Sequence, residues 1–387
     1  MLYKSNTWVG CILKPRLRKA NELYCIKLTF QELCYTGTTM ATSFDNQRLH
    51  DIAAYNSVML ESVKLYEFDA RLVLFRKLKR DLGDVLYKLE YDTLNLMAKK
   101  EVNQLIKQIK AVNQGFFSSV AKDVESMFEK FASKAIVSQK KKWVGISLAM
   151  ENEEDYFDEV NQDEADLYMQ EKQEKSLFPL ALLLGSGALF AERLLKTPIT
   201  GFGQTLTTVL EKYNELSNKR LEDLVLKAWS SGYTRDEIMK EILGDPSVKQ
   251  GKQGAIGTMR AQMNAIIDTA LGFAYEQAHS AATSSAGVAK KYIWISIMDG
   301  RTSAICIERN RKIYEVNKGP LPPAHANCRS STAPYIDDNG DVRAESFESW
   351  VSSLSENIQK DIKNYGSIDK STGKYKATAP MKPDEFF

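Results

Sequence analysis

The stretch KYIWISIMD, residues 291–299, changes the hydrophobic pattern of this chain and decides its fold class. Ile293, Ile295 and Ile297 fall on one face of an extended chain, because successive side chains of a strand point to opposite faces. The pair Asp299-Gly300 then gives a turn signal. The stretches RKIYEV (311–316) and RSSTAPYI (329–336) are also of strand type. We therefore expect a small β-element of three strands near the C-terminus.

Upstream of this element the sequence has the period of α-helices. Between residues 45 and 133, apolar residues recur at three- and four-residue steps, as at Leu78, Leu82, Val85 and Leu89. The bases and acids between them are interleaved, which is typical of a solvated helix face. This period predicts long helices, including a hairpin of helices at residues 92–112 and 116–135.

Helix signals also precede the β-element directly. Thr234 and Glu237 have the spacing of a capping box, and Gly244 gives the stop signal of the helix at residues 235–243. A long alanine-rich helix is expected at residues 258–284. The predicted fold class is therefore mainly α with a small C-terminal β-hairpin element (α+β), and the N-terminal region is elongated and helical.

Composition suggests a division of the chain into segments. Residues 1–39 hold three of the five cysteines and lack a sustained period, whereas a polar start and a helical pattern follow Met40. We expect residues 1–39 to be a non-native or disordered extension and Met40 to be the biological start. The remaining segments are a helical region at 40–139, a charged linker or insertion at 140–175, an α+β domain at 176–340, and a C-terminal helix with a flexible tail at 341–387. The linker contains nine acids between residues 151 and 166 with no base among them.

The overall composition excludes several classes of protein. The 387 residues are 43% hydrophobic and 26% charged, with a formal net charge of +2, so no strong basic field favours nucleic acid or an anionic membrane. No apolar run approaches the ~18–20 residues that cross a bilayer, and we expect no membrane partner. Five cysteines without a CxxC pair indicate a reducing compartment.

Two neighbouring stretches, DGRTSAIC (299–306) and GPLPPAHANCRSS (319–331), concentrate the residues that could carry chemistry. In a metal site, Cys306, His325 and Cys328 would bind Zn²⁺, with Asp299 as a candidate fourth ligand. A closed structural zinc site normally has four nitrogen or sulfur ligands. In the alternative, a thiol hydrolase, Cys306 or Cys328 would be the nucleophile and His325 the base. Neither an oxyanion hole nor an orienting third group is evident in the sequence.

A structural role accounts for more of these residues, and we favour it. Asp299 begins a turn, Gly300 can adopt a positive φ, and Thr302 or Ser303 can cap the backbone that follows. Prolines before His325 fix φ in an extended segment. His325 and Arg301 can then donate to carbonyl groups or to Asp299, and the cysteines become small buried residues.

The same residues carry a resemblance to a known family. The order W-x-x-x-x-D-x-R-T, a cysteine, an aromatic strand, then G-P-x-P-P-x-H-x-x-C-R is similar to that of the phage head morphogenesis family, the minor head proteins similar to the F protein of phage Mu. It is met here by Trp294, Asp299, Arg301, Thr302, Ser303, Cys306, Tyr314, Gly319, Pro320, Pro322, Pro323, His325, Cys328, Arg329 and Ser330. Ser303 and Ser330 stand where some relatives have cysteine. In the preceding helix, Asp268 and Ala270 depart from the Arg and Glu that relatives often carry.

The resemblance implies a minor structural protein of a tailed-phage head without enzymatic activity. Its expected partners are the portal protein, the scaffold or major capsid protein, and in some members packaged DNA, with roles in packaging or ejection. The expected location is the procapsid interior near the portal, after assembly in the host cytoplasm. No resident cofactor is implied, and zinc stays an open alternative on Cys306, His325 and Cys328. A zinc-dependent or thiol hydrolase and a DNA-contacting ejection protein are the alternative functions.

Overall fold

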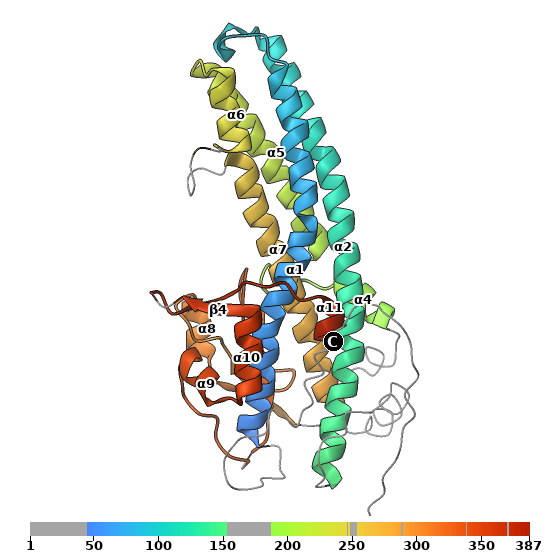
Figure 1. Ribbon diagram of the computed structural model, residues 1–387. Helices are drawn as coiled ribbons and strands as arrows, with labels where there is room; N and C mark the ends of the chain where they lie inside the picture. The colour runs from blue at the N-terminus through green and yellow to red at the C-terminus, as the bar shows by residue number, and fades with distance from the viewer. Residues whose placement is uncertain are drawn as a thin grey trace, which may run out of the picture.

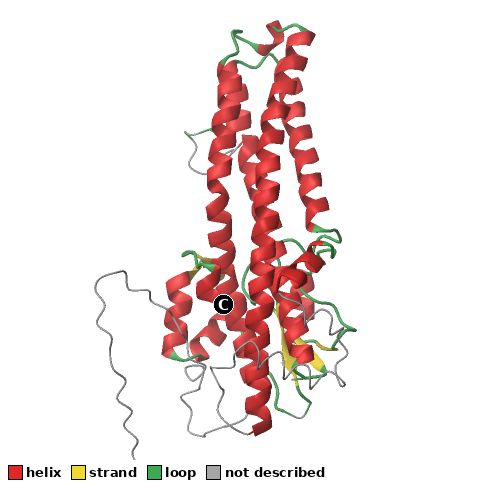
Figure 2. Cartoon of the chain, turned by 90° about the vertical axis from the view of Figure 1, so that its right-hand side faces the viewer, coloured by secondary structure: helices red, strands yellow, loops and turns green. Residues whose placement is uncertain are grey.

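The computed structural model describes residues 45–152, 187–245, 247, 254–287, 289–337, 339–369 and 371–387. Within residues 148–152 it describes the backbone alone. Long helices form an elongated shaft, and a compact base of short helices and strands surrounds its lower half (Figures 1 and 2). The shaft and base consist of α1 (Asn46–Tyr87), η2 (Leu94–Leu96), α2 (Lys99–Asn152), α4 (Gly187–Leu195), α5 (Leu206–Ser230), α6 (Arg235–Leu243), α7 (Gly254–Ser285), α8 (Ala304–Arg309), α9 (Phe347–Ser353), α10 (Glu356–Tyr365) and α11 (Pro383–Phe386).

The predicted strands form one antiparallel sheet in the base. The strands β1 (Lys291–Ile295), β2 (Ile313–Glu315) and β3 (Ser331–Tyr335) lie in the order β2-β1-β3. Trp294 of β1 is opposite Thr332 of β3. The predicted fold class, mainly α with a small β-element, is confirmed. A second hairpin, β4 (Gly366–Asp369) with β5 (Lys374–Ala377), was not predicted.

Helix α1 changes its surroundings along its length. Its upper half buries one stripe, Phe75, Leu78, Leu82 and Leu86, and the lysines and arginines between Phe75 and Leu82 are exposed, as the period predicts. Its lower half packs against β3, α7, α10, α11 and β5, and is buried on most sides. At 42 residues, α1 is about 63 Å long, which is why one helix belongs to both shaft and base.

The two helices predicted at 92–112 and 116–135 are one continuous helix, α2. Ile109, Phe116 and Val120 are all buried at spacings of seven and four residues, so the same face continues across Gly115. A glycine within a helix costs only about 1 kcal/mol, which is less than the burial of this face gains. The predicted break is therefore absent.

The start of the predicted charged linker at 140–175 is also helical, because α2 continues to Asn152. Trp143, Val144 and Ile146 are fully buried, and the indole Nε1 of Trp143 donates to His279 of α7 at 3.2 Å. Apolar side chains that follow the lysines thus continue the contact of α2 with α7. The rest of that segment, and the predicted extension at 1–39, lie outside the described residues.

The segment at 341–387, predicted as a helix with a flexible tail, contains the helices α9 to α11 and the hairpin β4–β5, and its last residues are packed. Tyr375 of β5 is fully buried, and the ring of Phe387 lies 5.1 Å from that of Phe131 in α2. The backbone N–H of Met381 donates to Ser62 of α1 at 3.1 Å. The aromatic residues that make these contacts are too far apart in the sequence to show a helical or strand period, so the sequence did not indicate the packing. Among the described residues, every helix is too short or too polar to span a bilayer.

The continuity of α2 predicts that Gly115→Ala raises the free energy of unfolding by about 0.5–1 kcal/mol, because alanine is the better helix residue. No atom lies within 4 Å of the added Cβ. Chemical denaturation measures the change. The matched control is Gly232→Ala at φ +64°, which should destabilise the protein. A destabilising Gly115→Ala would show that the helix is interrupted there.

Candidate functional site

The turn after β1 is built around the buried carboxylate of Asp299, whose side chain is 0% exposed. Arg329 donates to it through Nη1 at 2.9 Å and Nη2 at 2.5 Å. The backbone N–H groups of Arg301 and Tyr375 each donate to the carboxylate at 2.8 Å. This one side chain therefore connects the turn, the segment before β3, and the β4–β5 hairpin.

These hydrogen bonds outweigh the cost of burying the charge. Burial by itself would raise the pKa of Asp299, but the hydrogen bonds from the Arg329 guanidinium and the Arg301 backbone bring that pKa below its ordinary value. The carboxylate stays ionised at neutral pH, and its oxygens are fully engaged. Asp299 is therefore a structural group, and the expectation that it could be a fourth metal ligand is wrong.

Arg301 and Gly300 fix the hairpin β4–β5 against the same turn. The guanidinium of Arg301 donates to the carbonyl oxygen of Tyr375, and its Nε lies 3.9 Å from Asp299. Gly300 does not adopt the positive φ that the sequence suggested. A Cβ on Gly300 would instead lie 2.5 Å from the carbonyl oxygen of Thr372, so glycine is needed because the hairpin approaches closely.

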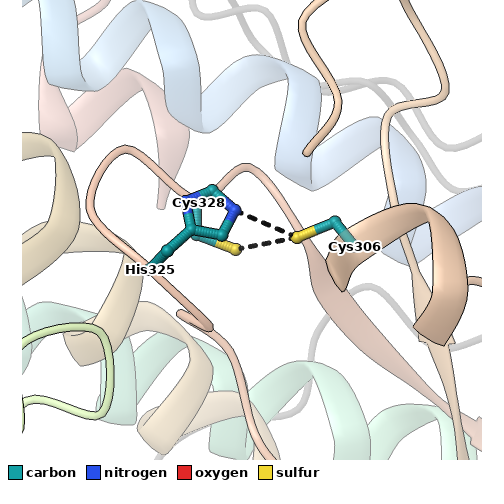
Figure 3. A group of neighbouring side chains, drawn as sticks. All are labelled: Cys306, His325 and Cys328. Atoms are coloured by element: carbon teal, nitrogen blue, oxygen red, sulfur yellow. Dashed lines mark hydrogen bonds between the residues drawn. The ribbon is translucent and has the colours of Figure 1, made fainter. Parts of the chain in front are cut away.

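Two thiols and an imidazole form a second cluster beside the sheet (Figure 3). Cys306 lies in α8, and His325 and Cys328 lie in the loop before β3. The Cys306 sulfur is 3.7 Å from the Cys328 sulfur and 3.2 Å from His325 Nε2. The Ser303 hydroxyl is 2.7 Å from the same Nε2 and, as N-cap of α8, accepts from the Cys306 backbone N–H.

The two thiols share a hydrogen bond, and their pKa values move in opposite directions. The contact with Cys306 lowers the pKa of Cys328 to about 5, and the same contact raises the pKa of Cys306. Backbone hydrogen bonds at Ala324 and Ser330 add to the lowering at Cys328. The pair therefore releases its first proton far more readily than its second.

Aromatic and proline residues of the motif enclose this cluster. Trp294 packs against both cysteines, with Tyr314 and Ala324 at the edge, and its Nε1 donates to Ser296 at 3.0 Å. The Ser296 hydroxyl in turn contacts the Cys306 carbonyl and the Ser330 hydroxyl, each at 3.0 Å. One side of the cluster is thus apolar and fixed by a short chain of hydrogen bonds.

The loop before the cluster packs closely against β1 and β2. A Cβ on Gly319 would lie 2.3 Å from the Tyr292 hydroxyl, which itself donates to the Pro320 carbonyl at 2.8 Å. Pro322 and Pro323 are buried, and the peptide bond between them is cis. After these prolines, His325 donates to the Ala326 carbonyl oxygen and contacts Ser303 and Cys306, and not Asp299.

The structure separates the predicted site residues into two groups. Arg301 and Arg329 gather at Asp299, and His325 and Cys328 gather at Cys306. Thr302 stays local, accepting from the Asp299 backbone N–H at 3.0 Å. The thiols are 3% and 2% exposed, so a substrate carbonyl cannot reach either sulfur in this arrangement.

Two acids of α7, Glu276 and Asp268, have raised pKa values that the sequence did not indicate. Glu276 accepts from the Thr332 hydroxyl beneath the sheet, and burial raises its pKa to about 8. Burial likewise raises the pKa of Asp268 to about 7, against the attraction of Lys64. An acid within a long apolar helix is the only sequence signal for either residue.

Residues 219–333 match the family model described as Phage Mu protein F like protein. The match extends from α5 to β3, and it confirms the resemblance that the motif suggested. It includes Asp299, Arg329 and all three residues of the thiol–imidazole cluster. No curated protein and no solved structure gives a significant match to the chain. Over these residues the chain is therefore similar to the Phage Mu protein F like family.

Asp299→Asn should lower the free energy of unfolding at pH 7 by about 3 kcal/mol, because it leaves the buried Arg329 charge uncompensated. The lowered pKa of Asp299 means that its contribution is present above its unfolded pKa of roughly 3.9 and is lost as pH falls through the folded pKa. The difference between variant and wild type should therefore shrink below about pH 4.

Denaturation at a series of pH values measures this difference. The control is Asp337→Asn, which removes an exposed ion pair with Lys291 and should cost less than about 0.5 kcal/mol. Equal costs for the two variants at pH 7 would contradict the structural role assigned to Asp299.

Proposed function

We propose that this chain is a minor structural protein of a tailed-phage head that associates with the portal during procapsid assembly. The observation that carries the proposal is the match of residues 219–333 to the Phage Mu protein F like family. The matched region includes α7 and the three-stranded sheet, around which the rest of the base is packed. In this proposal the base is a rigid support and the shaft reaches a partner.

The far end of the shaft has the features of a contact surface. There the turn from α1 to α2 is joined to the turn from α5 to α6: Leu94 N–H donates to the Tyr233 carbonyl at 2.8 Å, and Trp229 Nε1 donates to the Met97 carbonyl at 3.1 Å. The end is therefore fixed in shape, at the opposite end of the shaft from the base (Figure 1).

Two large apolar side chains are exposed at this end. Tyr87 is 70% exposed and Leu96 is 64% exposed, and the guanidinium of Arg235 lies 5.2 Å from the Tyr87 ring. Aromatic residues with a neighbouring arginine are enriched where protein interfaces gain most of their energy. We therefore place the portal contact at this end of the shaft.

In this role the chain is not an enzyme. It contributes to DNA packaging or ejection because it lies at the portal. The burial of both thiols argues against a thiol hydrolase, and a formal net charge of +2 gives little general attraction to DNA. Contact with the scaffold or major capsid protein is compatible with the same surface. The chain would then lie in the interior of the head, beside the portal.

Co-expression with the portal protein of the same phage tests the proposal through the amount of portal that co-purifies with the tagged chain. The double variant Tyr87→Ala with Leu96→Ala should recover about tenfold less portal than the wild type, because truncating central contact residues costs roughly 1–2 kcal/mol each. Circular dichroism and thermal unfolding should show little change, since both side chains are exposed.

Val73→Ala is the matched control, because Val73 is also a large exposed apolar residue of α1, at 58%, but lies within the shaft. It should leave portal recovery unchanged. Equal recovery with the double variant would remove the contact from the end of the shaft. Failure of the wild-type chain to co-purify with portal would refute the association itself.

A further inference from the structure

The thiol–imidazole cluster has the dimensions of a metal site. Its three donor atoms lie within 4.8 Å of one another, and the two sulfurs are 3.7 Å apart. With zinc–sulfur bonds of about 2.3 Å, two thiolates of a tetrahedral site are separated by about 3.8 Å. We propose that Cys306, Cys328 and His325 bind a zinc ion, which joins α8 to the loop before β3. This inference does not depend on the proposed function.

The imidazole of His325 is oriented as a metal ligand requires. Its Nδ1 lies 2.7 Å from the Ala326 carbonyl oxygen and donates to it, which leaves the lone pair of Nε2 directed at Cys306. Histidines that bind zinc typically donate their other ring N–H to a carbonyl or carboxylate, which fixes the tautomer and the direction of the ring. The contact therefore supports ligation independently of the distances among the donors.

The surroundings also suit an ion bound by two thiolates. Trp294 covers both cysteines from the apolar side, whereas His325 is half-buried at the edge of the cluster. An ion can thus enter past the imidazole and still be shielded from water behind the thiolates.

The fourth position of a tetrahedral site falls to Ser303 or water. The Ser303 hydroxyl lies 2.7 Å from His325 Nε2, and it also contacts the Cys306 thiol. A serine hydroxyl is a weak zinc ligand at neutral pH, so the site has three strong ligands. Ser303→Cys should add a fourth and strengthen binding.

Zinc content of the purified full chain, measured by inductively coupled plasma mass spectrometry after incubation with Zn²⁺ and dialysis, tests the proposal. A tag without histidine is required. We expect about one zinc per chain for the wild type and less than about 0.2 for Cys306→Ser and Cys328→Ser. The control replaces Cys11, Cys25 and Cys34 with serine together and should retain the ion, because the proposal assigns the ligands to Cys306, Cys328 and His325.

Cobalt provides a second measurement for the case in which a cysteine variant does not fold. Co²⁺ added to the folded wild-type chain should give a thiolate charge-transfer band in the near ultraviolet and visible bands of tetrahedral coordination, both abolished by Zn²⁺. In competition with a chelator, Ser303→Cys should bind Zn²⁺ at least about tenfold more tightly than the wild type, as expected for a fourth thiolate.

Two results would overturn the assignment. The first is a folded wild-type chain that keeps less than about 0.2 zinc and shows no cobalt charge-transfer band. The second is a Cys306–Cys328 disulfide in protein prepared without reductant, with zinc absent also after reduction; the pair would then be a redox couple. Unchanged zinc affinity in a folded Ser303→Cys variant would show that Ser303 does not lie at the fourth position.

Discussion

The burial of the Asp299 carboxylate is the constraint on which the base depends. A charge without access to water is stable only if its oxygens are engaged by donors, and Asp299 obtains them from Arg329 and from the backbone of Arg301 and Tyr375. These donors come from three segments that are distant in sequence. Satisfying one side chain therefore fixes the turn after β1, the loop before β3, and the C-terminal hairpin together.

Beside this ion pair, the thiol–imidazole cluster holds the same loop to α8. The two sets of contacts lie on adjacent segments, since Cys328 and Arg329 are consecutive in the chain. Their side chains serve different partners, with the sulfur directed to Cys306 and the guanidinium to Asp299. A loop rich in proline thus gains a defined course from two short side-chain interactions, and a zinc ion at the cluster would strengthen one of them.

Long helices connect the base to the shaft without a break. Asn46, at the start of α1, donates to the carbonyl oxygens of Ile336 and Gly340, each at 2.8 Å, and the base encloses this end of the helix. The other end of α1 reaches the turns at the far end of the shaft (Figure 1). One continuous helix therefore joins the base to the far end of the shaft.

Much of the fold and part of the site follow from local sequence. The apolar period at Leu78 and Leu82, the capping box of Thr234 with Glu237, and the alternation around Trp294 each act over a few residues, so they predicted helix and strand correctly. The same local signals predicted helix ends that are absent from α2. Gly115 and the lysines before Trp143 interrupt the apolar period of the sequence, but the buried face of α2 continues past them.

The sequence by itself determined that the chain is mainly helical with one small sheet, and that two cysteines, a histidine and an aspartate form a shared motif. Only the tertiary structure decided which of them meet: Arg329 binds Asp299, and His325 faces the thiols. It also decided that the C-terminal hairpin completes the Asp299 site through Tyr375, 76 positions away. The physical reason is that periodicity and capping depend on neighbours along the chain, whereas partners of buried polar groups depend on which segments the core brings together.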